Sequence, residues 1–333
     1  MIKNNFPASI NIIKTIVLLT LVVQLSGCPK NSAQSSNDDS NVDPQPTTKV
    51  ALVVTQDRAE GVKKLMQLLD FTPMEGKHVI VKPNFNTAHP APGSTHNATL
   101  QQIILETQER GATGITLAER SWQNFSDVIA QKQIDVMAND LSFNIVHLDT
   151  SASTMFKPIA MENWPSGIKL PNIIRDAEYI ITTGCLKTHH TGVITMSLKN
   201  SVGILPNSQM QQMHNSVRIN SMIAEINLAY KPDLIIMDGV LAFIDGGPST
   251  GTARNGNVMI AGTDRIAVDV VGTAILIELG STRVQRGRIF DLEQIKRAVE
   301  LNIGVSQAEE IEIITDDSTS AAYAEILKKI ILW

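Results

Sequence analysis

The chain has 333 residues, of which 43% are hydrophobic and 18% are charged, with 20 glycines and 14 prolines. This is an ordinary globular composition, and the length suits one large domain or two small ones. The formal net charge of −5 excludes the basic balance of a nucleic-acid-binding protein, so no nucleic acid is expected as a partner and any positive site must be local.

The first 27 residues predict a secretory signal peptide. Lys3 and Lys14 precede the short apolar run 16–25, which is followed by Leu-Ser-Gly-Cys ending at Cys28. These four residues resemble a bacterial lipobox, which implies cleavage before Cys28 and lipid attachment to it. We therefore expect a membrane anchor at Cys28 and a location in the bacterial cell envelope. Pro29, in place of Asp, favours the outer membrane if the cell is Gram-negative.

Residues 28–48 predict a disordered tether, because PKNSAQSSNDDSNVDPQPTT after the cysteine is polar and has no apolar periodicity. A single α/β domain is then expected over 49–333. The chain has two cysteines, Cys28 and Cys185, and the lipid would consume the first. We therefore expect no intrachain disulfide, no iron–sulfur cluster and no thiolate zinc site.

From residue 49 onward, apolar runs alternate with amphipathic stretches. The apolar runs predict strands at 50–54, 78–82, 114–119, 143–149, 179–184, 234–239, 257–262 and 311–315. Helices are predicted at 58–70, 97–110, 124–139, 215–230, 264–279 and 291–302, with Asn97 and Asp264 as N-caps. The stretch 150–170 has no clear period and predicts a loop or a small excursion. The alternation predicts an α/β fold with a mainly parallel sheet and helices on both faces.

Polar side chains stand at or just after the ends of several predicted strands. In a parallel sheet these ends share one edge, which is where open α/β sheets bind ligands. Polar residues also flank strands in any protein, but several lysines, acids and histidines beside glycines favour a ligand crevice. The residues expected to contact the ligand from strand ends are Lys82, Asn84, Lys187, Thr188 and Asp238.

The stretch TTGCLKTHHTGVITMSLKNSVG, residues 182–203, predicts an anion site. VITMSLKN after Gly192 predicts a short helix, and the N–H groups at a helix start favour an anion. Lys187 before this helix, with Lys199 and Asn200 inside it, would add charge and polar contacts. The chain has no Walker loop and no GxGxxG after a strand. The expected ligand is therefore a small phosphate or carboxylate compound.

Histidines form a second group of candidates. We expect His189 or His96 to exchange protons, because imidazole titrates near neutral pH, and Glu119 or Asp238 to orient a histidine or help to hold a metal. No HExxH or similar spacing is present, so a divalent metal is one candidate cofactor without a motif of its own. Its candidate ligands are His96, His189, His190 and His214. Cys185 is predicted to be a buried small side chain rather than a nucleophile.

Several motifs occur in the order seen in the domain of unknown function 362 family, which the chain resembles over about residues 50–302. They are VKPN (81–84), the loop ending in Thr95-His96, LKTH (186–189), LKNSVG (198–203), KPDLIIMDG (231–239), GGP (246–248) and TDRIAVDVVG (263–272). The resemblance implies an α/β domain with this strand–helix order and no established reaction. Many relatives carry a ferredoxin-like cysteine segment, which two cysteines cannot supply. The matching positions are Lys82, Pro83, Asn84, His96, Lys187, His189, Lys199, Asn200, Asp238 and Asp269.

Asp269 lies within a helix of apolar periodicity, where a polar contact to the site and a buried structural hydrogen bond both remain open.

Three classes of function fit these observations. The first is an envelope enzyme that acts on a small anionic substrate, and the second is a non-catalytic lipoprotein that captures an anion or a metal for a partner. The third is a structural envelope protein, which would need no buried cluster of lysine and histidine. A lipid anchor and a tether suit the first two equally. Turnover separates them, because a receptor releases its ligand unaltered.

Overall fold

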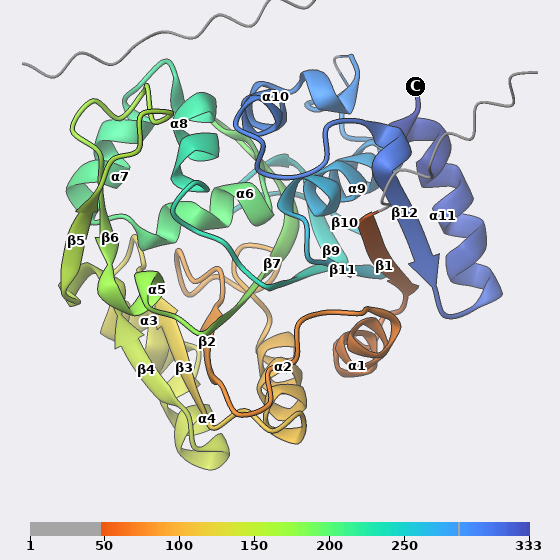
Figure 1. The fold of residues 1–333 in the computed structure, drawn as a ribbon. Coiled ribbons are helices and arrows are strands. Elements are labelled where there is room, and N and C mark those ends of the chain that lie inside the picture. The colour runs from red at the N-terminus through yellow and green to blue at the C-terminus, as the bar shows by residue number, and fades with distance from the viewer. Residues whose placement is uncertain (1–47, 286) are drawn as a thin grey trace, which may run out of the picture. The chain divides into compact units, whose positions relative to one another are not determined.

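The computed structural model describes residues 48–285 and 287–333 (Figure 1). The predicted signal peptide, the lipidation site at Cys28 and the tether up to residue 47 lie outside the described residues. None of the described helices is both long and apolar enough to cross a membrane. The described residues begin with strand β1 at Thr48, one residue before the predicted start of the domain.

Eight strands form the body of a mixed sheet in the order β12-β1-β11-β9-β7-β2-β3-β4. Neighbours in this path are parallel except at β11, which is antiparallel to both β1 and β9. The bounds are β1 Thr48–Val54, β2 His78–Lys82, β3 Gly114–Glu119, β4 Asn144–His147, β7 Tyr179–His189, β9 Leu234–Gly246, β11 Val258–Gly262 and β12 Ile311–Thr315. All eight predicted strands are therefore present, in a mainly parallel sheet as predicted.

Four further strands were not predicted. Two extend the sheet beyond its central strands: β8 Val193–Thr195 pairs with the end of β7, and β10 Gly251–Asn255 pairs with β9. The other two, β5 Ser153–Phe156 and β6 Ile168–Pro171, form a separate antiparallel pair in the region predicted to be a loop or small excursion. Short edge strands of this kind lack a long apolar run, so their pattern is weak in the sequence.

Helices cover both faces of the sheet, because each central strand is apolar on both sides. Val50 and Leu52 pack with α6–α11, whereas Ala51 and Val53 pack with α1–α4. The bounds are α1 Arg58–Leu68, α2 Asn97–Glu109, α3 Phe125–Gln131, α4 Ile134–Leu141, α5 Asn172–Arg175, α6 Ser197–Asn200, α7 Asn207–His214, α8 Ile219–Ile226, α9 Arg265–Glu278, α10 Glu293–Glu300 and α11 Ser318–Ile331. Short 3₁₀ turns are η1 Leu148–Thr150, η2 Ser201–Ile204, η3 Ile289–Asp291 and η4 Ala308–Glu310.

Each region predicted to be helical contains a helix, but several helix boundaries differ from the prediction. Asp264 caps α9 as predicted, because its Oδ1 accepts a hydrogen bond from Ala267 N at 2.8 Å. The predicted cap Asn97 is instead the first residue of α2, and His96 is the cap. The predicted helix 124–139 is divided into α3 and α4 at Gln133, whose φ of 55° is left-handed and cannot continue a helix.

Strands β7 and β9 run on past the carboxyl end of their neighbour β2, and this extension builds up that edge of the sheet. Strand β2 ends at Lys82 opposite Thr182, but β7 continues to His189. The register between β7 and β9 shifts between Cys185 and Lys187, as at a β-bulge. LKTH was expected in a loop after a strand ending at 184, but it forms the end of β7 itself.

Candidate functional site

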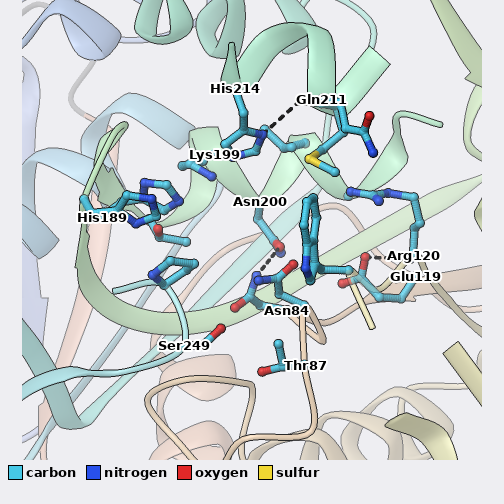
Figure 2. Close-up of a pocket in the computed structure, with 18 of the residues that line it drawn as sticks. Asn84, Thr87, Glu119, Arg120, His189, Lys199, Asn200, Gln211, His214 and Ser249 are labelled. Carbon is cyan, nitrogen blue, oxygen red and sulfur yellow. Dashed lines mark hydrogen bonds between the residues drawn. The ribbon is translucent and has the colours of Figure 1, made fainter. Parts of the chain in front are cut away.

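A cavity of about 560 Å³ lies at the carboxyl ends of β2, β3 and β7 (Figure 2). This volume is in the range typical of small-molecule sites. Predicted site residues in its lining are Lys82, Asn84, Glu119, His189, His190, Lys199, Asn200 and His214. Residues in its lining that were not predicted are Asn86, Thr87, Arg120, Trp122, Thr195, Val202, Gly203, Met210, Gln211, Asn215, Pro248 and Ser249.

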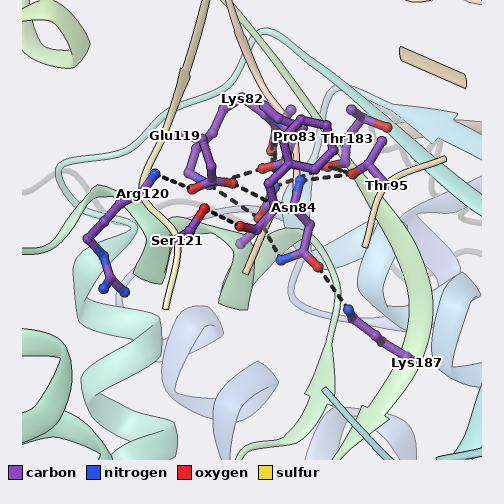
Figure 3. A network of polar contacts seen from close by, with 12 residues as sticks. Lys82, Pro83, Asn84, Thr95, Glu119, Arg120, Ser121, Thr183 and Lys187 are labelled. Carbon is purple, nitrogen blue, oxygen red and sulfur yellow. Dashed lines mark hydrogen bonds and ion pairs between the residues drawn. The ribbon is translucent and has the colours of Figure 1, made fainter. Parts of the chain in front are cut away.

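Lys82 and Glu119 form a buried ion pair at one wall of the cavity (Figure 3). Lys82 Nζ lies 3.1 Å from both carboxylate oxygens of Glu119, and the lysine is fully buried. Glu119 also accepts backbone hydrogen bonds from Phe85 and Arg120 at 3.1 and 2.8 Å. Burial lowers the pKa of Lys82, although the adjacent Glu119 favours the charged form. Glu119 is therefore engaged by Lys82 and the backbone, and among the described residues it makes no hydrogen bond to a histidine.

Asn84 and Asn200 connect this ion pair to β7. Asn84 Nδ2 donates to Asn200 Oδ1 at 3.4 Å, and Asn200 Nδ2 donates to Thr182 Oγ1 at 2.7 Å. Asn200 Oδ1 also accepts from Lys82 Nζ at 3.3 Å. The network holds α6 against the ends of β2 and β7, so the two asparagines have both a structural role and a surface in the cavity.

Lys187 does not line the cavity. Its ammonium donates to Asn84 Oδ1 at 2.8 Å, to Gly93 O at 2.7 Å and to Pro248 O at 3.0 Å. These three acceptors use all three donors of the ammonium group. Lys187 therefore ties two loops to β7, and the structure gives its charge no open face for the ligand contact predicted from the sequence.

Thr188 and Asp238 also have structural partners and lie outside the cavity lining. Thr188 Oγ1 is 3.3 Å from the carbonyl oxygens of Phe243 and Gly246. Asp238 is fully buried, with its Oδ2 at 2.6 Å from Arg58 Nε. Asp238 makes no hydrogen bond to a histidine among the described residues, so the geometry does not support its predicted orienting role.

Arg120 and Lys199 are the two cations in the lining that no acidic side chain pairs with, among the residues that the structure describes. They are only 5% and 7% exposed. Arg120 Nε is buried without a hydrogen-bond partner. Lys199 lines the cavity, and its Nζ makes no hydrogen bond or ion pair within the described chain. Glu119 is the only acidic residue in the lining within the described part of the chain, and it is paired with Lys82. Figure 2 shows the Arg120 and Lys199 side chains pointing toward the cavity from opposite sides of the view.

The environment of Lys199 disfavours its charged form. Burial is the main cause, and the positive charges of Lys187 and Arg120 add to it, so that the pKa of Lys199 falls to about 7. Sequence reasoning found Lys199 through its motif but missed Arg120, although Arg120 directly follows Glu119 at the end of a predicted strand. Its position at that strand end was the available signal.

The helix start that was predicted to bind a ligand anion is already occupied by an acid of the chain. Residues 193–195 form β8, and the short helix α6 begins only at Ser197. The buried carboxylate of Asp269 accepts hydrogen bonds from Ser197 N at 2.7 Å and Leu198 N at 3.0 Å. Burial raises the pKa of Asp269 to about 7. Asp269 therefore fixes α6 and the lysine it carries, and does not contact the cavity.

Three histidines line the cavity, and the hydrogen bond made at Nδ1 determines which ring nitrogen of each carries the proton. His189 Nδ1 accepts from Thr191 N at 3.1 Å and Gly192 N at 3.0 Å, so its proton is on Nε2. His190 Nδ1 and His214 Nδ1 each lie 2.9 Å from a backbone carbonyl oxygen, so they donate and leave Nε2 as an acceptor. Burial lowers the pKa of both His189 and His214.

This geometry argues against proton exchange at His189. The Nδ1 lone pair already accepts two backbone hydrogen bonds, and burial keeps the ring neutral with its proton on Nε2. The neutral ring can donate a hydrogen bond through Nε2. His190 stacks on His189 with ring centroids 4.7 Å apart, and His214 lies 6.0 Å from His189.

Three of the four predicted metal ligands, His189, His190 and His214, line this cavity, but the fourth, His96, lies apart from them. His96 caps α2 through Nδ1, which accepts from Ala98 N at 3.1 Å, and it lines a separate cavity of about 350 Å³ with Lys132. No group of three or more His, Cys, Asp or Glu side chains is arranged to hold a metal ion in the described ranges. Cys185 is buried, and burial raises its pKa to about 12, which agrees with its prediction as a small buried side chain.

Comparison with known proteins agrees with the resemblance found in the sequence. Over 114 residues the chain is 32% identical to a thylakoid-associated protein of Synechocystis, and this match covers 33% of the chain and 36% of the relative. The chain thus matches about a third of the length of that relative. The fold shares a TM-score of 0.43 with the lactate racemase apoprotein from Thermoanaerobacterium thermosaccharolyticum, at 12% identity and over 85% and 86% of the two chains. Such a likeness is too remote to transfer a function.

The family model for the domain of unknown function DUF362 matches residues 79–274, which is more than half of the chain and includes every wall of the cavity. The order of strands, the family motifs and this match lead to one conclusion. The chain belongs to the DUF362 family.

Proposed function

We propose that the cavity binds a small organic anion, with its carboxylate or phosphate group held between Arg120 and Lys199. The observation that supports this is the pair of nearly buried cations without an acidic partner among the described residues. Holding a charge away from water costs several kcal/mol unless it is paired. A ligand anion would supply the missing partner and be bound by charge-assisted hydrogen bonds.

The other walls of the cavity support an organic ligand rather than a bare inorganic ion. The volume of about 560 Å³ is much larger than one phosphate group needs. Amide and hydroxyl groups of Asn86, Gln211 and Ser249 in the lining would contact polar parts of a ligand, and Met210 and Val202 would add apolar contact. His189 would donate a hydrogen bond from Nε2, whereas His214 would accept one at Nε2.

We propose that the anion binds without a metal ion. Two rings, His190 and His214, leave a lone pair on Nε2 in the cavity, and catalytic zinc sites use three protein ligands. Lys199 shares this side of the cavity, and its positive charge would repel a cation. Elemental analysis of the purified protein tests this point. A stoichiometric divalent metal that is lost in His214→Ala would contradict it.

Calorimetric titration with organic anions tests the central proposal. A panel of oxalate, pyruvate, citrate and a sugar phosphate covers both anionic groups. Arg120→Ala and Lys199→Met should each weaken binding of the preferred anion by about 100-fold, because each removes one partner of a buried charge pair. Arg254→Ala is the matched control, since Arg254 is exposed on β10. Equal affinities in all four proteins would overturn the proposal.

Capture without chemistry is the second candidate function. It is supported by His189, whose predicted proton exchange the ring geometry disfavours. A binding protein would return the ligand unaltered after long incubation, whereas an enzyme would convert it. Nuclear magnetic resonance of the ligand recovered from the protein separates the two.

We further propose that the chain is a lipoprotein anchored to the cell envelope through Cys28. The support is the sequence Leu-Ser-Gly-Cys after a short apolar run that begins with basic residues. Replacing Cys28 with Ser should move the protein from the membrane fraction of cells to the soluble fraction and abolish lipid labelling. Labelling that persists in the variant would contradict the assignment.

A further inference from the structure

The site contains three buried lysines, and they differ in what their ammonium groups contact. Lys82 is paired with Glu119 at 3.1 Å. Lys187 donates to three oxygen acceptors at 2.7–3.0 Å. Lys199 makes no hydrogen bond and no ion pair within the described chain, yet it is only 7% exposed and lines the cavity. The first two are structural cations, and the third is an amine directed into an open space.

The stem of Lys199 packs closely against the chain. The stem of Lys199 passes over Gly192, where a Cβ would lie 2.9 Å from Lys199 Cε and 3.2 Å from Cδ. A side chain at this position would press against the lysine stem and displace it. The helix that carries Lys199 is fixed at its start by Asp269. The amine is therefore held in place by packing, and its nitrogen remains free.

The surroundings of Lys199 favour a neutral amine. Burial and the nearby charges of Lys187 and Arg120 lower its pKa to about 7, so a large fraction is uncharged at neutral pH. A lysine activated by loss of water and by neighbouring cations is the usual nucleophile toward carbonyl carbon.

We propose that Lys199 forms an imine with the carbonyl carbon of an aldehyde or ketone that also carries the anionic group held by Arg120. This rests on the proposed function, and it narrows the ligand class to anionic carbonyl compounds such as 2-oxo acids. Arg120 would hold the carboxylate and thereby present the carbonyl carbon to the amine. His214, whose Nε2 lone pair faces the same cavity, is the group placed to move the proton.

The step balances without any further reagent. The lone pair of Lys199 Nζ attacks the carbonyl carbon, and the C=O π pair moves to the oxygen. A proton passes from nitrogen to that oxygen through His214 Nε2, which gives a neutral carbinolamine. The nitrogen lone pair then forms the C=N bond as the hydroxyl leaves with one proton from solvent, so one water is released and one proton is consumed.

Reduction with borohydride tests the imine directly. The protein is incubated with glyoxylate, pyruvate, 2-oxoglutarate or dihydroxyacetone phosphate and then reduced, and the adduct is located by peptide mass spectrometry. We expect one adduct per chain, on the peptide that contains Lys199, for at least one probe. Lys199→Arg, which keeps the charge, should lose the adduct completely. Exposed Lys231 serves as the internal control in the same digest, so the result does not depend on a variant that folds.

Calorimetric titration with the same oxo acids and the matched hydroxy acid, lactate, distinguishes the two proposals. Binding of these anions with no adduct on Lys199 would overturn the imine and leave the anion site intact. An adduct found only on other lysines would overturn the imine as well. Neither binding nor adduct, for these probes and for the wider anion panel, would overturn both.

Discussion

Replacing Lys199 with Met should make the ligand-free protein more stable, and the gain should depend on pH. The lysine is 7% exposed and its ammonium has no partner within the described chain. Its pKa falls from the ordinary 10.5 to about 7. At about 1.4 kcal/mol for each pKa unit, a charged Lys199 lowers the free energy of unfolding by about 5 kcal/mol. A buried methionine carries no such penalty.

The sign of the pH dependence follows from the protons bound in each state. Between pH 7 and 10.5 the native state holds fewer protons than the unfolded state, so wild-type stability rises with pH. The advantage of Lys199→Met should therefore be complete below pH 7 and shrink above it. From pH 6 to pH 9 it should fall by about 3 kcal/mol. Lys187 titrates in both proteins, so its contribution cancels to first order.

Reversible urea unfolding at pH 6 and pH 9, at constant ionic strength, measures this difference. Fluorescence is a suitable signal because Trp164 is buried in the core. Lys231→Met, at an exposed position, is the control and should show no pH-dependent change. A Lys199→Met variant that is less stable than the wild type at pH 6, or whose difference is the same at both pH values, would refute the reasoning.

Three further predictions concern the groups that hold the site together. Glu119→Gln should lower the free energy of unfolding by about 3–5 kcal/mol, because it leaves Lys82 as an unpaired buried charge; thermal denaturation measures this, and an unchanged midpoint would contradict the pair's role. Gly203→Ala should lower both stability and anion affinity, because its Cβ would overlap Lys82 Nζ and Glu119 Oε1. Gly184→Ala is its control, since the nearest atoms there are 3.6 Å away, and equal effects of the two would argue against this cause. Asp269→Ala should cost about 1–3 kcal/mol for each of the two amide N–H groups it leaves unpaired at the start of α6, and calorimetric titration should show weaker anion binding as well.

Much of the fold follows from patterns that are local in the sequence. All eight predicted strands are present because apolar runs buried on both faces are long and distinct. The rule that ligands bind at the carboxyl ends of parallel strands correctly gathered Lys82, Asn84 and Glu119 with the residues after β7. Helix α7 was missed because its polar sequence has a weak apolar period, and the cavity residue Gln211 that it carries was therefore not predicted. His214, at the end of the same helix, was predicted as a candidate metal ligand and lines the cavity.

What the sequence could not supply is the list of partners of each charged group. Lys187 and Lys199 have equivalent standing as motif lysines, but the carbonyl oxygens of Gly93 and Pro248 come from distant loops and bind only the first. Likewise, the helix start in 193–200 seemed open to a ligand because its occupant, Asp269, lies about seventy residues further along the chain. Which charged side chains are buried, and which of them have hydrogen-bond or ion-pair partners, is decided only when the chain folds. The sequence therefore could not show that Lys187 has partners and that Lys199 has none within the described residues.

A crystal structure of the protein soaked with selenate tests the central claim most directly, because selenium gives an anomalous signal that locates the oxyanion without assumptions. The account predicts a peak in the cavity between Arg120 and Lys199, and its loss in Arg120→Ala crystals treated in the same way. A peak at some other surface, or an empty cavity at a concentration that fills surface sites, would contradict the assignment of this cavity as an anion site.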